Sequence, residues 1–213
     1  SLNLIDGLIN DAGRISNEFA DKENLFDVST LKEPYRQEGK KTMGYEIAEQ
    51  FKWNLPDTIV YPTGGGTGIV GMWKAFNEME ELGWIGSKRP KMFSVQAVGC
   101  APIVKAFKEN TMHAELWENA STKAAGMRVP VAVGDYLILE ALRESGGGVA
   151  AIEDEDMIHN MRLIASKQGI LPAPEGAATY VGLNQLVSEG KVDKDEKILL
   201  MNTGSAFKSF ELM

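Results

Sequence analysis

The sequence predicts an α/β fold in which a mostly parallel sheet is covered by helices on both faces. From Thr58 onward, short β-branched or apolar runs alternate with longer stretches of helical periodicity. Strands that are separated by helices usually run parallel, and a parallel sheet needs cover on both faces. A glycine-rich stretch, PTGGGTG at residues 62–68, falls where the first of these strands passes into the first helix.

The first repeating unit consists of a strand, a helix and a second strand. We expect these elements at residues 58–61, 68–82 and 92–97. Apolar residues recur every three or four positions in the helix, and Gly83 follows as a stop signal. Further helices are expected at 102–108, 136–144, 156–167 and 175–188, and further strands at 149–152 and 197–201.

Residues 1–50 differ from the rest of the chain. They contain the charged, turn-rich stretch DVSTLKEPYRQEGKKT and a helical run at 43–50, with few apolar residues. We therefore expect residues 1–50 to be a lead-in segment from a preceding part of the protein, and residues 51–213 to form one large domain. The chain starts at Ser1 rather than methionine, which indicates a processed product or a piece of something longer.

The composition is that of an ordinary globular protein and narrows the classes of function. Hydrophobic residues make up 44% and charged residues 24% of the chain. The net charge of −8 disfavours nucleic-acid binding, because no basic excess can neutralise a phosphate backbone. The sequence has neither a basic leader followed by an apolar block nor an apolar run of membrane-spanning length. We expect a cytoplasmic protein with no nucleic-acid or membrane partner.

Cysteine and histidine are too scarce for a disulfide framework or a zinc cluster. The chain has one cysteine, Cys100, and two histidines, His113 and His159. We therefore expect no metal. Cys100 lies in VQAVGCAP and is interpreted as a small, half-buried residue rather than a nucleophile.

The PTGGGTG loop carries the sharpest chemical signal. Its successive glycines let the backbone approach a ligand closely, and the N-terminus of the following helix adds its positive end. The expected ligand is a phosphate. A tight structural turn is the alternative. The loop lacks the Lys-Ser or Lys-Thr of a Walker loop and the spacing of the GxGxxG dinucleotide fingerprint.

Residues 61–107, from YPTGGGTG to GCAPIVKAF, resemble the phosphate-loop segment of threonine synthases, which are fold type II pyridoxal-phosphate enzymes. Other stretches resemble the same family in the same order. They are FDVSTLKEPYRQEGKKTMGYEIAEQ before the loop, then RVPVAVGDYLIL, LPAPEGAAT and LLMNTGSAFK after it. The resemblance covers essentially the whole chain.

The resemblance implies roles for particular residues. Thr203, in NTGS, matches the serine or threonine whose hydroxyl meets the pyridine nitrogen, and Arg36 resembles the arginine near the substrate phosphate. The residues implied to hold the phosphate of pyridoxal 5'-phosphate are Gly64, Gly65, Gly66, Thr67 and Gly68.

Three of these interpretations have alternatives. Thr203 could be an ordinary turn threonine. Arg36 could belong to a solvated basic face with Lys32, Lys40 and Lys41. Glu175, in PEGAAT, could lie near the cofactor ring or could simply favour the start of a helix.

The resemblance also implies a Schiff-base lysine, in a serine-phenylalanine-lysine-aspartate context upstream of every stretch seen here. None of the 16 lysines has that setting; Lys22, Lys74 and Lys105, for example, lie in ADKEN, MWKAF and IVKAF. We therefore assign no catalytic residue within this chain. We expect it to be a C-terminal fragment that is inactive alone.

For the whole enzyme, the resemblance implies the conversion of O-phosphohomoserine and water to threonine and phosphate. Another fold type II lyase or dehydratase is the alternative within the same enzyme class. A non-catalytic module that binds a phosphorylated metabolite is the alternative outside it. The sequence leaves the oligomeric state open, with a homodimer among the options.

Overall fold

The computed structural model describes residues 2–213 and contains a four-stranded, all-parallel sheet. The strand order is β3-β2-β1-β4, so the last strand in the sequence pairs with the first. The strands are β1 (Thr58–Pro62), β2 (Lys91–Ala97), β3 (Gly148–Ile152) and β4 (Ile198–Leu200). The predicted class, a parallel α/β sheet, is confirmed.

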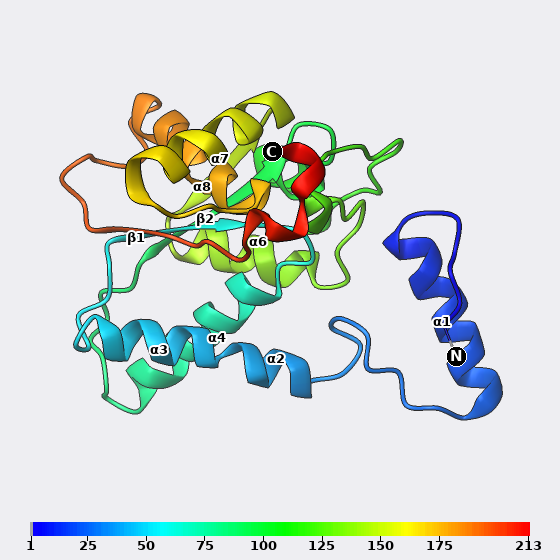
Figure 1. Cartoon of the computed structure of the whole chain (residues 1–213). Helices are drawn as coiled ribbons and strands as arrows, with labels where there is room; N and C mark the ends of the chain where they lie inside the picture. The colour runs from blue at the N-terminus through cyan, green and yellow to red at the C-terminus, as the bar shows by residue number, and fades with distance from the viewer. Residues whose placement is uncertain (1) are drawn as a thin grey trace.

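Helices cover both faces of the sheet (Figure 1). Successive residues of β1 point to opposite faces: Ile59 packs in the cluster with α4 and α6, whereas Val60 packs in the cluster with α7 and α8. The helices of the first face are α4 (Thr67–Glu81), α5 (Pro102–Lys108) and α6 (Asp135–Glu144), and those of the second are α7 (Asp154–Gln168) and α8 (Pro174–Ser188). The predicted cover on both faces is therefore confirmed.

The first 50 residues form three helices, of which only the last was predicted. They are α1 (Ile9–Glu23), α2 (Tyr35–Lys40) and α3 (Thr42–Gln50). Both α2 and α3 pack against α4. Gly39 lies inside α2, and α2 and α3 are separated at Lys41.

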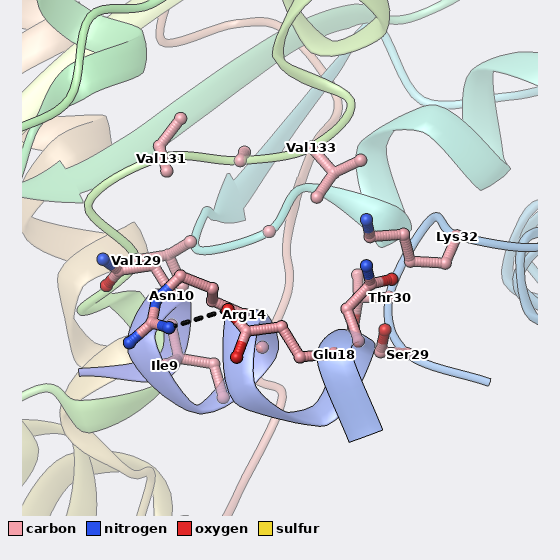
Figure 2. Close-up of a pocket in the computed structure, with 14 residues that line it drawn as sticks. Ile9, Asn10, Arg14, Glu18, Ser29, Thr30, Lys32, Val129, Val131 and Val133 are labelled. Carbon is pink, nitrogen blue, oxygen red and sulfur yellow. Dashed lines mark hydrogen bonds and ion pairs between the residues drawn. The ribbon is translucent and has the colours of Figure 1, made fainter. Parts of the chain in front are cut away.

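Helix α1 stands apart from the helices around the sheet (Figure 1). Ala20 is its buried residue, and Ile9 and Phe19 are mostly exposed. Figure 2 shows Asn10 and Arg14 of α1 on one side of a cavity, facing Val131 and Val133 on the other. The chain between α1 and α2 therefore brings polar side chains close to the glycine-rich loop.

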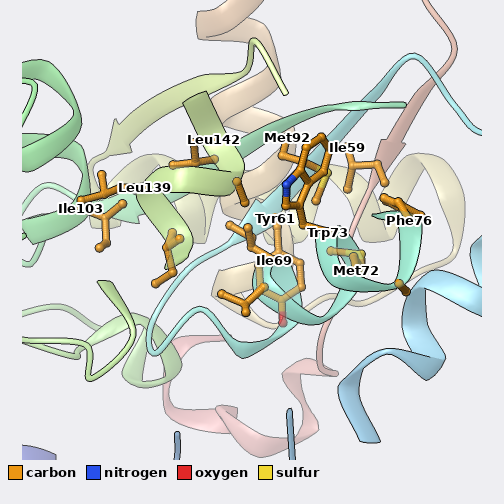
Figure 3. Packing of buried hydrophobic residues seen from close by; sticks show 14 of the residues in the cluster. Ile59, Tyr61, Ile69, Met72, Trp73, Phe76, Met92, Ile103, Leu139 and Leu142 are labelled. Carbon is orange, nitrogen blue, oxygen red and sulfur yellow. The ribbon is translucent and has the colours of Figure 1, made fainter. Parts of the chain in front are cut away.

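The larger hydrophobic core lies between the sheet and α4 (Figure 3). Ile69, Met72 and Phe76 of α4 are fully buried there, as the three- and four-residue spacing predicted. Burying one such side chain stabilises a fold by about 1.5–3 kcal/mol. This packing fixes the N-terminus of α4, and with it the loop that precedes the helix.

No helix in the described part of the chain, residues 2–213, has the length and apolar character needed to cross a membrane.

Candidate functional site

The site lies where two neighbouring strands end. Strands β1 and β4 run parallel with Val60 opposite Leu200, so their carboxyl ends meet at one edge of the sheet. The glycine-rich loop follows β1, and Thr203 follows β4. Open α/β sheets bind their ligands at this edge. Pairing of the first and last strands thus brings together two residue groups that are far apart in the sequence.

A cavity of about 420 Å³ occupies this position. We call it the phosphate-loop cavity. Its walls include four of the five loop residues that the sequence singled out, together with Thr203, which is exposed. Those four are Gly64, Gly65, Gly66 and Thr67. Gly68 lies one residue further on, in the first turn of α4 and behind the wall.

Three of the glycines are required by packing, whatever the loop binds. A Cβ on Gly64 would lie 2.2 Å from the carbonyl oxygen of Gly126, and one on Gly68 would lie 2.2 Å from the hydroxyl of Tyr61. Gly66 has a φ of 75°, in the left-handed region that favours glycine. These positions form the tight turn that the sequence offered as the alternative to an anion site.

Gly65 is different, because the protein leaves the space beside it open. A Cβ there would meet only Thr30 Cγ2, at 3.5 Å, which is an ordinary van der Waals contact. Packing within the chain therefore does not explain a glycine at this position. A ligand that approaches the backbone does explain it.

The loop also leads into the N-terminus of a helix, which carries a partial positive charge. Helix α4 begins at Thr67 after Gly66, and no side chain caps its N-terminus. The amide groups of its first turn are then free to donate to a ligand, and the helix dipole favours a negative charge there. Gln37 Nε2 donates to the carbonyl oxygen of Thr67 at 3.1 Å, which ties α2 to this turn.

Two cavity residues received no functional role from the sequence. Tyr61 lines the cavity at the end of β1, and burial raises the pKa of its hydroxyl, so the group remains a hydrogen-bond donor near neutral pH. Lys208 lines the cavity five residues after Thr203 and is exposed. Tyr61 directly precedes the PTGGGTG loop, and Lys208 closes the NTGSAFK stretch, so their positions in these motifs were the available signals.

Glu175 also lines the cavity, from the first turn of α8. Its Oε1 accepts a hydrogen bond from the backbone N–H of Gly126 at 2.7 Å. The carboxylate is therefore bonded to the turn that packs against Gly64.

A second cavity, of about 600 Å³, lies between α1 and the loop (Figure 2). We call it the α1 cavity. Its polar residues include Asn10 from α1 and Thr30 and Lys32 from the following segment. Gly65 lines both cavities, so they adjoin at the loop.

Arg36 lies outside the walls of both cavities. Its Nη1 donates to the carbonyl oxygen of Val28 at 3.3 Å and to Thr30 Oγ1 at 3.1 Å. The guanidinium thus holds the segment that supplies Thr30 to the α1 cavity.

The basic residues between Lys32 and Lys41 do not form one solvated face. Lys41 lies 2.5 Å from Glu38 and 2.7 Å from Glu78, and its side chain is only 13% exposed. Hydrogen bonds from Lys41 to these two carboxylates raise the pKa of its ammonium. The interpretation as a solvated face was therefore wrong for Lys41, which belongs to the packing of α2 and α3 on α4.

Cys100 is fully buried rather than half-buried as expected. Burial is the largest cause of the raised pKa of its thiol, so the group stays protonated near neutral pH. This environment agrees with a packing role.

Comparison with known proteins identifies the family. The profile described as pyridoxal-phosphate dependent enzyme matches residues 2–204, which is nearly the whole chain. The chain belongs to this family. Its cofactor is pyridoxal phosphate.

Threonine synthases are among its relatives. Those of Methanocaldococcus jannaschii and Methanosarcina acetivorans are 35% and 36% identical to this chain over 204 residues. In each case the match covers 96% of this chain and 50% of the relative. The chain therefore spans about half the length of the curated relatives that it matches.

Solved structures of the same fold are more distant in sequence. The processed form of threonine deaminase isoform 2 from Solanum lycopersicum matches with a TM-score of 0.76 at 19% identity, covering 99% of this chain and 56% of that one. Maize serine racemase matches with a TM-score of 0.70 at 17% identity, covering 97% and 60%. At these identities the likeness shows the fold alone, which is that of the fold type II pyridoxal-phosphate enzymes.

Proposed function

We propose that this chain supplies the cofactor-anchoring part of a threonine synthase, which converts O-phosphohomoserine and water to threonine and phosphate. The observation that carries the proposal is the meeting of an uncapped helix N-terminus and Thr203 in one cavity. The similarity to threonine synthases supports this substrate over others.

The phosphate-loop cavity fits the phosphate group of the cofactor. The backbone amides of the glycine-rich loop and of Thr67 would donate to the phosphate oxygens, and Gly65 leaves the space for a close approach. Tyr61 and Lys208 are further donors in the same wall.

Thr203 is the proposed partner of the pyridine nitrogen. A hydroxyl does not hold that nitrogen protonated as a carboxylate would, so the ring withdraws electrons less strongly. When bound, the cofactor supplies the electron delocalisation that a substrate needs to lose its α proton. The contribution of Thr203 is to fix the orientation of the ring.

The α1 cavity is the proposed place for the substrate. It adjoins the cofactor site at Gly65 and offers the ammonium of Lys32 and the hydroxyl of Thr30 to a phosphorylated substrate. Val131 and Val133 line the opposite side and offer apolar surface to the carbon chain. Arg36 positions Thr30 through the hydrogen bond between them.

Another fold type II lyase or dehydratase is the second candidate, since a phosphate loop and a ring-nitrogen hydroxyl serve elimination from unphosphorylated amino acids equally well. The two candidates differ in what the substrate releases. A chain that spans the full length of the relatives should release phosphate from O-phosphohomoserine. Release of ammonia from threonine or serine, with no phosphate from O-phosphohomoserine, would favour the second candidate.

A further inference from the structure

Glu175 places an acidic side chain in the wall of the proposed phosphate site. A carboxylate there repels a phosphate, so a compensating role is needed to explain it. A negative charge in the first turn of α8 is favoured by the helix dipole, but the Glu175 side chain makes no hydrogen bond to the free amides of that turn. The carboxylate instead bonds to Gly126, which lies 49 residues away in the sequence.

Gly126 belongs to a short segment that supports the phosphate loop. It lies in a 3₁₀ turn, Ala125–Met127, whose last residue is buried. The carbonyl oxygen of Gly126 lies so close to Gly64 that a Cβ on Gly64 would be 2.2 Å from it. The position of this turn therefore limits where the loop can lie.

The segment is held by carboxylates at two points. Asp154, at the start of α7, accepts hydrogen bonds from Thr122 Oγ1 at 2.5 Å and from the backbone N–H of Lys123 at 2.7 Å. Glu175, at the start of α8, accepts the hydrogen bond from Gly126 at 2.7 Å. Glu175 is the point of attachment next to the loop.

We propose that Glu175 is a positioning residue for the cofactor phosphate, acting through Gly126 on Gly64. The carboxylate holds the turn against the loop, and the turn holds the loop amides in the arrangement that binds the phosphate. The inference rests on the proposed function, in that pyridoxal phosphate is the ligand of this loop. It assigns Glu175 to the phosphate end of the cofactor rather than to its ring.

Two substitutions distinguish the positioning role of Glu175 from an effect of its charge. Glu175→Gln keeps an oxygen that can accept from Gly126 and removes the charge, whereas Glu175→Ala removes both. We expect Glu175→Ala to weaken the binding of pyridoxal 5'-phosphate by about 5-fold to 10-fold, as for the loss of one ordinary hydrogen bond. Glu175→Gln should bind at least as tightly as the unsubstituted chain, because it keeps the acceptor for Gly126 and removes the repulsion of the phosphate.

Titration with pyridoxal, which has no phosphate, locates the effect. If Glu175 acts on the phosphate loop, Glu175→Ala should leave the affinity for pyridoxal unchanged. Equal losses for pyridoxal and pyridoxal 5'-phosphate would overturn the inference in favour of a contact with the ring. Glu155→Ala, which removes an exposed carboxylate from the first turn of α7, is the matched control and should change neither affinity.

A readout without the cofactor keeps the two proposals separate. In the ligand-free chain, Glu175→Ala should shift the backbone amide resonances of Gly126 and Gly64, and Glu175→Gln should shift them much less. Unmoved Gly64 resonances in Glu175→Ala would overturn the positioning role even if the cofactor binds. If the resonances shift but the chain binds no pyridoxal 5'-phosphate, the coupling of Glu175 to the loop is supported. The proposed function is then contradicted.

Discussion

Gly65 differs from the other glycines of the loop in what a side chain would meet. Gly64, Gly66 and Gly68 would each bring a Cβ to within 2.2 Å or less of another residue, whereas Gly65 meets only Thr30 at 3.5 Å. Substitutions at the first three positions therefore disturb the fold as well as any ligand. Among these four glycines, only Gly65 can be substituted to test ligand binding while the fold stays intact.

We expect Gly65→Val to weaken the binding of pyridoxal 5'-phosphate at least tenfold, or about 1.4 kcal/mol. The added side chain would fill the space between the loop and Thr30, where the two cavities adjoin. The free energy of unfolding should change by less than about 1 kcal/mol. Calorimetric titration and chemical denaturation measure the two quantities.

The matched control is Gly86→Val, because a Cβ on Gly86 has no neighbour within 4 Å and the residue is exposed. It should leave both the affinity and the stability unchanged. Unaltered affinity in Gly65→Val would show that the loop is only a turn.

Thr203→Ala should weaken cofactor binding by about 0.5–1.5 kcal/mol, the typical contribution of one hydrogen bond. Thr203 is exposed at the cavity wall, so the effect should be confined to binding. Thr203→Ser keeps the hydroxyl and should restore the affinity. A large fall in the melting temperature with unchanged affinity would instead assign Thr203 to the fold.

The sequence predicted the loop and Thr203 because both lie in short motifs with recognisable chemistry. It did not predict which glycine is free of packing, since two of the neighbours that decide this, Gly126 and Ile138, lie more than 50 residues away. It left the role of Glu175 open for the same reason. Its partner Gly126 becomes a neighbour only when α8 folds onto the sheet.

At the scale of elements, α4 links the core to the lead-in helices through a group of charged residues. Lys41, where α2 meets α3, lies 2.7 Å from Glu78 of α4, and the hydroxyl of Tyr45 donates to the same carboxylate at 3.0 Å. The hydrogen bond from Lys41 lowers the pKa of Glu78 below its ordinary value of 4.5. The charged form of Glu78 is therefore favoured in the folded chain.

Glu78→Gln should lower the free energy of unfolding at pH 7 by about 0.5–1 kcal/mol, as for a partly exposed ion pair. A lowered folded-state pKa gives stability that is present above the unfolded pKa, near 4.5, and is lost as the pH falls through the folded pKa. The difference between the two chains should therefore be constant from about pH 5.5 to 9 and shrink below pH 4.5. Denaturation at several pH values measures it; a difference that grows on acidification would contradict this assignment.

Most elements were predictable because each buries a regular face. The helix at 102–108 has the predicted bounds, and the strands agree to within one residue at each end. Helix α1 was missed because residues 1–50 as a whole were interpreted as turn-rich and poor in apolar residues, although the helix itself is amphipathic. Helix α2 was missed because it lies in a charged, turn-rich stretch; Pro34 lies before its first residue, where proline does not interrupt the helix.

At the scale of the whole molecule, activity of this chain alone depends on whether one of its lysines can carry the cofactor. Lys208 is the one lysine in the wall of the phosphate-loop cavity among residues 2–213. Lys74, which sits in the helix after the loop, pairs instead with Glu38 on the outer side of α4. A threonine synthase needs a lysine that carries the cofactor and exchanges protons at the α and β carbons. General acid–base catalysis raises the reaction rate by about 100-fold to 10,000-fold, but only when the base is correctly positioned.

We therefore expect the 213-residue chain to be inactive alone, and a chain that spans the full length of the relatives to release phosphate and form threonine from O-phosphohomoserine. Incubation of both chains with pyridoxal 5'-phosphate and substrate, followed by assays of phosphate and threonine, tests this.

Borohydride trapping and peptide mapping test the competing role of Lys208 directly, because a covalent adduct there would locate a reactive amine within this chain. Turnover by the 213-residue chain that is lost in Lys208→Ala would make Lys208 the catalytic lysine. Turnover that survives Lys208→Ala would refute the assignment of the catalytic lysine to the rest of the enzyme.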